Sequence, residues 1–220
     1  GGGTGSNTGF GTRGLFIAGF IPSSNQQNII DYVTISTLGD AQDFGDSTIK
    51  VFQDGVCSSR TRSFALGGSG VSAQLKEIST NIFASLGNGT DFGDLSDLNY
   101  GNKGFSDATR GVSVGGEGPS SSAGINMMEY ITMASTGAAK DFGDLSVVNI
   151  GPFTTMNTTR GVILGGRKGN PSTRLYNHIE YVTIQTTGNT TDFGDLYLAA
   201  VAAANAGSIC NATRGFAVGG

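Results

Sequence analysis

Two charged motifs recur along the chain and hold five of its eight arginines and eight of its thirteen aspartates. Asp-Phe-Gly-Asp occurs four times, beginning at Asp43, Asp91, Asp141 and Asp192. A Thr-Arg step followed by glycine or serine occurs five times, with its arginines at Arg13, Arg62, Arg110, Arg160 and Arg214. A guanidinium group and a carboxylate form strong bidentate pairs when they are partly buried. We therefore expect structural ion pairs between these arginines and the first aspartate of each motif, within or between repeats.

Calcium binding is the alternative use of the same aspartates, because hard cations bind several oxygen ligands. The candidate ligands are the two aspartates of each motif: Asp43, Asp46, Asp91, Asp94, Asp141, Asp144, Asp192 and Asp195. No Asp-x-Asp-x-Asp-Gly run accompanies them. The ion-pair interpretation is therefore favoured, and neither a metal site nor a cofactor is predicted.

Catalytic chemistry has little support in the residue types. Four equal copies of a carboxylate pair suit architecture better than one active site. His178 is the only histidine, so it has no partner for a zinc site. Asp-Phe-Gly matches the kinase magnesium motif but lacks the other kinase motifs around it. We therefore predict no catalytic residues and a protein that is not an enzyme.

Composition excludes several functional classes. The chain has 220 residues, of which 37 are glycine, and only 14% are charged, with a net charge of −4. A general nucleic-acid binder needs a basic face that releases counterions, and this chain has none in its composition. No apolar run approaches the length of about 18 residues that a membrane span requires. We expect neither nucleic-acid binding nor membrane insertion.

The motifs belong to a repeat of about 50 residues. The Asp-Phe-Gly-Asp copies are 48, 50 and 51 residues apart. We expect a single repeat domain over residues 1–220, with repeats at about 12–60, 61–108, 109–158 and 159–212 and a partial fifth at 213–220. Apolar residues alternate after each arginine, as in Val112 and Val114, which is typical of a strand. Most of these strands end in a glycine pair, such as Gly115-Gly116.

Each repeat contains enough pattern for four short strands. The arginine strand is followed by a second strand such as Ile179-Glu180-Tyr181, then by the Asp-Phe-Gly-Asp strand, then by a fourth strand that runs back to the next arginine. Blades of this kind must stack on neighbours, because one four-stranded sheet cannot bury both of its faces. The sequence predicts an all-β, β-propeller-like repeat protein with four-stranded antiparallel blades, and a β-solenoid is the alternative. Residues 1–12 and 213–220 supply only half of a fifth blade, which favours part of a longer chain or an open assembly.

The repeat as a whole resembles known sequences. The units Thr-Arg-Gly-x-x-x-x-Gly-Gly, Ile-Glu-Tyr-x-Thr-Ile and Asp-Phe-Gly-Asp-Leu, clearest between Thr159 and Leu196, resemble repeats of bacteriophage tail-fibre and appendage proteins, especially those of marine and cyanobacterial phages. The glycine pairs resemble those of kelch-type repeats. The phage resemblance implies a structural, host-facing role on the virion and brings no catalytic residues.

Three functions follow in order of preference. The first is a non-enzymatic virion module whose loops bind a host-surface glycan or protein. The connection from the glycine pair to the next strand varies in length between repeats, as binding loops on rigid scaffolds do. The candidate binding loop contains Arg167, Lys168, Asn170, Arg174 and Tyr176.

The alternatives are a filament or adhesin and a glycan-active enzyme. An extracellular or cell-surface filament would assemble through its end strands, since head-to-tail contacts that do not close form filaments. A propeller-fold enzyme that acts on glycans is the third possibility. In the first two cases we expect other virion or filament subunits as partners and a location on the virion or on an extracellular surface.

Overall fold

A computed structural model describes residues 12–22, 25–52, 55–119, 122–170, 174–197, 207–211 and 213–218. The described residues form antiparallel β-strands joined by turns and loops, without a helix among them. The predicted all-β class is therefore confirmed. The strand expected in residues 1–12 lies outside the described residues except for Thr12.

The strands form small sheets that follow one another along the chain. Sheet 1 has three strands, sheets 2 to 4 have four each, and two further pairs complete the described strands. In chain order they are β1 (Arg13–Ile21), β2 (Asn25–Thr34) and β3 (Gln42–Val51) in sheet 1; β4 (Gly55–Ser58), β5 (Arg62–Ser69), β6 (Gln74–Ile82) and β7 (Thr90–Asn99) in sheet 2; β8 (Lys103–Ser106), β9 (Arg110–Val114), β10 (Met127–Thr132) and β11 (Lys140–Asp144) in sheet 3; β12 (Phe153–Met156), β13 (Arg160–Leu164), β16 (His178–Thr183) and β17 (Thr191–Asp195) in sheet 4; β14 (Arg167–Lys168) with β15 (Arg174–Leu175); and β18 (Gly207–Cys210) with β19 (Gly215–Val218).

The predicted four-stranded antiparallel unit is confirmed, but its strands are grouped differently. The strand before each arginine pairs with the arginine strand that follows it, as β4 does with β5, and not with the preceding strands. The sequence period of about 50 residues is unchanged, and sheets 2 to 4 each begin one strand before the arginine. The reason is local, because only residues 59–61 separate β4 from β5 and so short a connection makes an antiparallel hairpin.

The Thr-Arg step is the end of this hairpin turn. In sheet 3 the side chain of Asp107 accepts hydrogen bonds from the backbone N–H groups of Thr109 and Arg110, at 2.7 and 2.8 Å. Short polar side chains commonly hold turns in this way. The residue three positions before the arginine does the same in the other described turns; it is Ser59, Asn157 or Asn211.

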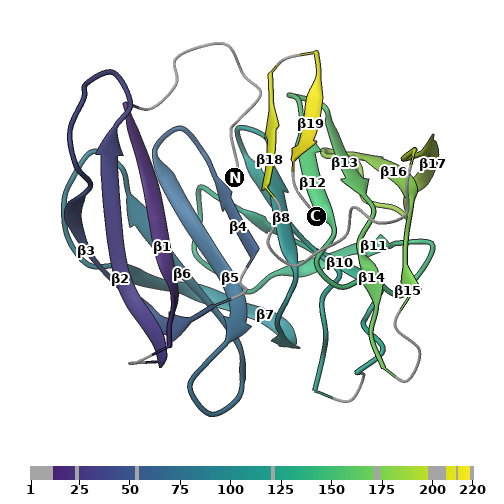
Figure 1. The fold of residues 1–220 in the computed structure, drawn as a ribbon, viewed down its shortest axis with the longest axis horizontal. Coiled ribbons are helices and arrows are strands. Elements are labelled where there is room, and N and C mark those ends of the chain that lie inside the picture. Colours follow the sequence, from purple (N-terminus) through teal and green to yellow (C-terminus); the bar gives the residue numbers. More distant parts are fainter. Residues whose placement is uncertain are drawn as a thin grey trace.

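The sheets stand side by side in chain order. Figure 1 shows them from β1–β3 at the left to β16 and β17 at the right, with the first strands β4, β8, β12 and β18 toward the middle. Hydroxyl groups link successive first strands: Ser106 Oγ donates to the carbonyl of Ser58 at 2.7 Å, and Thr154 Oγ1 donates to the carbonyl of Gly104 at 2.8 Å. The described sheets do not close into a ring.

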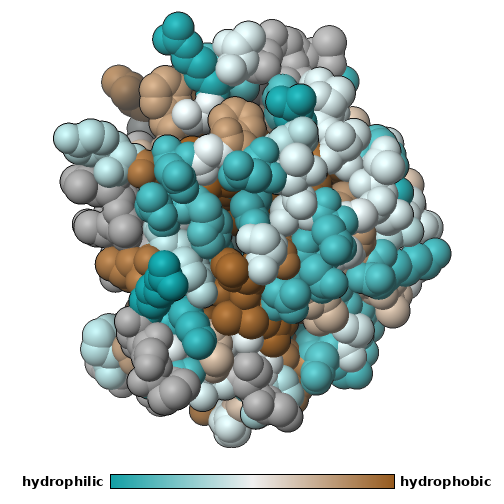
Figure 2. All heavy atoms as spheres, turned by 90° about the vertical axis from the view of Figure 1, so that its right-hand side faces the viewer, coloured by the Kyte–Doolittle hydropathy of each residue, from teal (hydrophilic) through white to brown (hydrophobic). Residues whose placement is uncertain are grey.

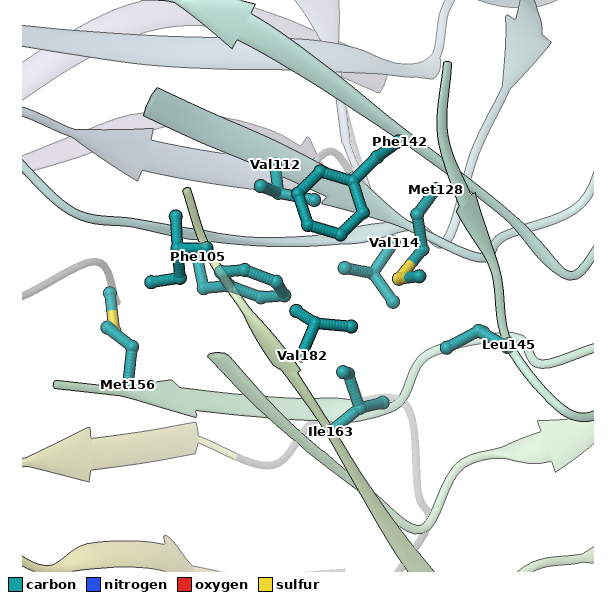
Figure 3. Packing of buried hydrophobic residues seen from close by; sticks show 10 residues of the cluster. Phe105, Val112, Val114, Met128, Phe142, Leu145, Met156, Ile163 and Val182 are labelled. Carbon is teal, nitrogen blue, oxygen red and sulfur yellow. The ribbon is translucent and has the colours of Figure 1, made fainter. Parts of the chain in front are cut away.

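The core lies between the sheets. One cluster combines Phe105, Val112, Val114, Met128 and Phe142 of sheet 3 with residues of sheet 4. Figure 3 shows its side chains converging from these neighbouring sheets. A second cluster places Ile131 of β10 and Met133, which directly follows β10 in sheet 3, against the apolar face of sheet 2. Each sheet therefore buries one face only because the next sheet covers it, as the repeat predicts.

We predict that the phenylalanine of Asp-Phe-Gly-Asp stabilises the fold only where a following sheet covers it. Phe142 is 1% exposed, whereas the equivalent Phe193 of sheet 4 is 53% exposed. Phe142→Ala should lower the free energy of unfolding by about 3–5 kcal/mol, and Phe193→Ala should lower it by less than about 1 kcal/mol. Urea unfolding of the two variants measures the difference. Equal losses would contradict this role.

Candidate functional site

Each Asp-Phe-Gly-Asp motif forms a bulged bend in its strand. The first aspartate accepts a hydrogen bond from the backbone N–H of the glycine two residues later, at 3.0 Å from Gly45 to Asp43. The three later copies repeat this bond at 3.0, 3.1 and 3.2 Å. The register with the neighbouring strand shifts at the same point in every copy; in sheet 1 Ile30 faces Gly45 and the next residue faces Asp43, so Phe44 is the extra residue of the bulge.

The bulge is where one sheet holds the next. The glycine turn before the following Asp-Phe-Gly-Asp motif donates two backbone N–H groups to it, from Gly87 to the carbonyl of Phe44 at 2.8 Å and from Gly89 to that of Asp46 at 2.6 Å. Gly137 and Ala139 bind the second motif in the same way, and Gly188 and Thr190 bind the third, at distances of 2.7 to 2.9 Å. We call this contact between the bulge of one sheet and the glycine turn of the next a junction.

Close approach explains the glycine in the motif. Gly45 has a φ of +136°, and a Cβ there would lie 2.6 Å from the carbonyl of Gly87 in the next sheet. The second and third copies, Gly93 and Gly143, meet the next glycine turn closer still, with φ values of +143° and +137°. A side chain at these positions would both strain the backbone and separate the sheets.

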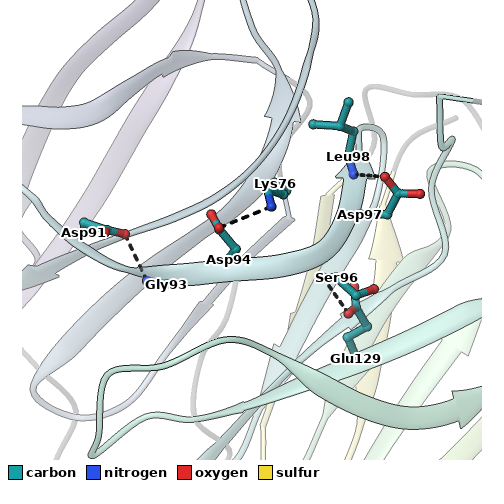
Figure 4. A network of polar contacts seen from close by, with 8 residues as sticks. All are labelled: Lys76, Asp91, Gly93, Asp94, Ser96, Asp97, Leu98 and Glu129. Atoms are coloured by element: carbon teal, nitrogen blue, oxygen red, sulfur yellow. Dashed lines mark hydrogen bonds and ion pairs between the residues drawn. The ribbon is translucent and has the colours of Figure 1, made fainter.

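Polar side chains add to the junctions. Glu129 of sheet 3 accepts a hydrogen bond from the backbone N–H of Ser96 in sheet 2 at 2.9 Å, as Figure 4 shows. Glu180 accepts from Ser146 in the same way at 3.3 Å. Glu129 is 3% exposed, and burial raises its pKa against the opposing effect of the hydrogen bond from Ser96.

The repeated arginines contact tyrosines and carbonyl groups, not the aspartates. The guanidinium of Arg110 lies over the ring of Tyr130, 4.2 Å from its centre, and donates to the carbonyl of Ile184 in the next sheet at 2.9 Å. Arg13 and Arg160 lie over the equivalent tyrosines of their own sheets, Tyr32 and Tyr181. A guanidinium above an aromatic ring is attracted by the electrons of the ring.

The expected ion pairs are therefore not the arrangement that the structure shows. Among the described residues, no ion pair joins a repeated arginine to the first aspartate of a motif. The arginines are Arg13, Arg62, Arg110, Arg160 and Arg214, and the aspartates are Asp43, Asp91, Asp141 and Asp192. The physical reason is that each of these carboxylates already accepts the N–H of its own bulge, while the tyrosine strand lies beside the arginine strand. The one ion pair in the described part joins Lys76 to Asp94 at 3.4 Å, and both side chains are about half exposed, so it stabilises the fold little (Figure 4).

The alternative of a calcium site gains no geometric support. The eight aspartates of the motifs are spread over four sheets, and the described residues contain no group of three or more acidic, histidine or cysteine side chains that could hold a metal ion. His178 packs against the ring of Tyr176, with ring centres 4.8 Å apart. Cys57 is buried, and burial raises the pKa of its thiol to about 12, so it is a poor nucleophile at neutral pH.

The candidate binding loop forms a small hairpin beside sheet 4. Arg167 and Lys168 form β14 and pair with β15, which begins at Arg174; Asn170 is exposed in the turn, and residues 171–173 of this loop lie outside the described residues. Tyr176 is only 8% exposed, so its ring is part of the packing and is not displayed to a ligand.

Backbone contacts hold this hairpin against neighbouring repeats. Arg167 and Ile150 exchange backbone hydrogen bonds at 2.8 and 3.1 Å, and Gly169 donates to the carbonyl of Ala123 at 3.0 Å. Nearby, burial and a hydrogen bond to Glu117 raise the pKa of Tyr100 to about 12. Arg167, Glu117 and Tyr100 thus place charge and hydrogen-bonding groups at the same end of the sheets.

The sequence motifs missed the residues that hold the turns and junctions. These are the turn residues Ser59, Asp107, Asn157 and Asn211, the junction asparagines Asn88 and Asn189, and the glutamates Glu129 and Glu180. The sequence did contain a signal for the turn residues, because a serine, aspartate or asparagine stands three residues before four of the five repeated arginines. Only the structure shows which groups they contact.

Comparison with known proteins adds no family. No protein-family model matches the chain, and no curated protein matches it. No helix in the described part of the chain is long and apolar enough to cross a membrane.

The glycine of the motif offers a matched pair of variants. Gly93→Ala and Gly194→Ala introduce the same side chain at φ values of +143° and +135°, but only Gly93 lies against a following sheet. Backbone strain should cost about 1–3 kcal/mol of folding free energy at both positions. Gly93→Ala should cost about 2 kcal/mol more, because two backbone hydrogen bonds of the junction are lost. Urea unfolding compares them, and an equal cost at both positions would show that the close approach contributes nothing.

The burial of Glu129 predicts a pH-dependent difference in stability between the native protein and the variant Glu129→Gln. Because burial raises the native pKa of Glu129, its contribution to stability is complete below its unfolded pKa of about 4.3 and is lost as the pH rises through the native value. Glu129→Gln keeps an acceptor for Ser96 without a charge. The variant should match the native protein at low pH and become relatively more stable toward neutral pH. Urea unfolding of both proteins over this pH range tests the sign of the difference in free energy of unfolding. A variant that becomes more stable relative to the native protein as the pH falls would refute the prediction.

Proposed function

We propose that this protein is a non-enzymatic module of a bacteriophage tail fibre or appendage, located on the virion, whose loops bind a glycan or protein of the host surface. The observation that carries the proposal is the arrangement of the loops on the sheets that the junctions hold together. The connections from each arginine strand to the next long strand of its sheet comprise residues 22–24, 70–73, 115–126 and 165–177. Figure 1 shows the described residues at which these connections begin and end together at the lower end of the sheets. Rigid scaffolds with variable loops on one side commonly carry binding sites.

The arrangement of the sheets supports a propeller as the finer fold. Successive first strands lie next to each other, and the sheets fan out from them as blades do from the centre of a propeller (Figure 1). We propose that the four sheets and β18–β19 are consecutive blades. Other virion subunits are the expected structural partners, and the prediction that the protein is not an enzyme stays a prediction.

An extracellular filament or adhesin is the second candidate. It is favoured by one observation, the apolar outer face of sheet 4, where Phe193 is 53% exposed. Contacts through such a face that do not close would form filaments. Sedimentation velocity separates the two functions, since a monomer at all concentrations disfavours the filament.

Charge reversal in the loop hairpin tests host binding. The double variant Lys168→Glu with Arg174→Glu changes two basic side chains of the candidate loop. Its control is Arg60→Glu with Lys140→Glu, which makes the same charge change in exposed turns and strand ends away from this loop. The loop variant should bind intact marine cyanobacterial cells and a glycan array at least about tenfold more weakly, the effect of about 1.4 kcal/mol, and the control should bind as the native protein does.

Thermal unfolding shows whether both double variants keep the fold. Unchanged binding by the loop variant, or an equal loss in the control, would overturn the proposed binding surface.

A further inference from the structure

The outer face of sheet 4 carries the same groups as the three junctions but has no partner among the described residues. Phe193 is 53% exposed, whereas Phe44, Phe92 and Phe142 are 1 to 2% exposed. A Cβ on Gly194 would meet nothing within 4 Å, although its equivalents in the other motifs lie against the next glycine turn. The bulge itself is complete, because Gly194 donates to Asp192 at 3.2 Å. One half of a junction is therefore formed, and no described residue supplies the other half.

An apolar groove of about 330 Å³ lies beside this half-junction. Its lining includes Val162, Leu164, Ile179 and Phe193, together with Arg160 and Arg214. Figure 2 shows apolar atoms gathered between polar ones in the middle of the face on which β16 and β17 lie. An exposed apolar surface rimmed by polar groups commonly marks an interaction site.

The equivalent surfaces of the inner sheets show what covers such a groove. In sheet 3 the equivalent residues Val112, Val114, Met128 and Phe142 are 0 to 1% exposed, and Val182 and Ile184 of the next sheet belong to the same cluster. In sheet 2 the equivalent face is covered by Ile131 and Met133. The cover is in both cases a pair of apolar residues, two positions apart, on or just after the third strand of the following sheet.

The β18–β19 pair shows which strand edge such a third strand would pair with. β19 is an arginine strand that begins one residue after Arg214, and it pairs only with β18 among the described strands. The arginine strands β5, β9 and β13 each pair in addition with a third strand on the side opposite their first strand. The free edge of β19 and the groove on sheet 4 are thus open to the same incoming element.

We propose that this groove is a docking site for a β-hairpin of the protein's own repeat type, which carries a Tyr-Val-Thr-Ile strand, a glycine turn and an Asp-Phe-Gly-Asp strand. The hairpin pairs with the free edge of β19, its two apolar residues fill the groove, and its glycine turn donates to the carbonyls of Phe193 and Asp195. The three junctions inside the molecule are the evidence for this occupant. Sheet 1 of a second copy fits less well, because its β1 would need the place that β19 already holds.

A synthetic peptide of residues 178–195 is the first probe, because this segment forms such a hairpin within sheet 4. Titrated into the full-length, isotope-labelled protein, it should give saturable NMR shifts at Val162, Leu164 and Ile179. A control peptide with N-methylglycine in place of Gly188 lacks only the N–H that, within the protein, donates to the carbonyl of Phe142 in sheet 3. It should bind at least about tenfold more weakly.

Protein variants locate the site. Phe193→Ala should weaken binding of the peptide at least about tenfold, and Leu38→Ala, at a fully exposed position in sheet 1's turn, should leave it unchanged. Shifts confined to other surfaces would overturn the proposal. A concentration-dependent dimer that Phe193→Ala abolishes would also overturn it, because it would identify a second copy as the occupant.

An isolated two-stranded hairpin is marginally stable in water, so the free peptide can fail to bind because it does not fold. A fusion protein that carries the hairpin at its own C-terminus decides the outcome in that case. Residues 167–197 are appended after Gly220, so that Gly219-Gly220 takes the place of Gly165-Gly166 in the repeat. The melting temperature should rise by about 5 °C, and Phe193→Ala should remove the gain. The proposal is overturned if neither the free nor the attached hairpin occupies the groove.

Discussion

The backbone hydrogen bonds at the junctions are the interaction on which the rest of the structure depends. Two N–H groups of a glycine turn donate to two carbonyls of a bulged strand in the preceding sheet, and this pattern occurs three times. The bulge is necessary because it turns those carbonyls away from their own sheet. The motif glycine is necessary because a Cβ would keep the two backbones apart, as the 2.6 Å approach at Gly45 shows. The side chains of the core, such as Phe142, become buried only when this contact is made.

The charged residues of the motifs bind backbone groups and aromatic rings and do not pair with each other. The first aspartate binds its own bulge, the arginine lies over a tyrosine, and Arg110 also reaches the carbonyl of Ile184 in the next sheet. These contacts hold each sheet in a fixed relation to its neighbours. A row of sheets held in this way is a scaffold on which the connecting loops differ in length from one repeat to the next.

The same contacts define both ends of the row. The turn at Gly39 in sheet 1 is the equivalent of the glycine turns that donate at the junctions, and it donates to no bulge among the described residues. The bulge at Gly194 in sheet 4 is the equivalent of the bulges that accept. A stack of this kind has one donor end and one acceptor end, so its growth or closure depends on which partner each end finds. The proposed host binding and the proposed docking of a further hairpin concern different surfaces of the molecule, the loops at one end of the sheets and the outer face of sheet 4.

The sequence by itself determined the all-β class, the period and the four-stranded unit, because alternation of apolar residues and regularly placed glycines are local properties of the chain. The tertiary structure decided the grouping of strands and the partners of the charged side chains. Arg110 precedes Tyr130 by 20 residues and Ile184 by 74, and no local rule selects these partners over Asp141. The exposure of Phe193, in a motif identical to that of the buried Phe142, likewise depends on whether another sheet lies beside it. Burial is a property of the neighbouring sheet, which the motif alone does not contain.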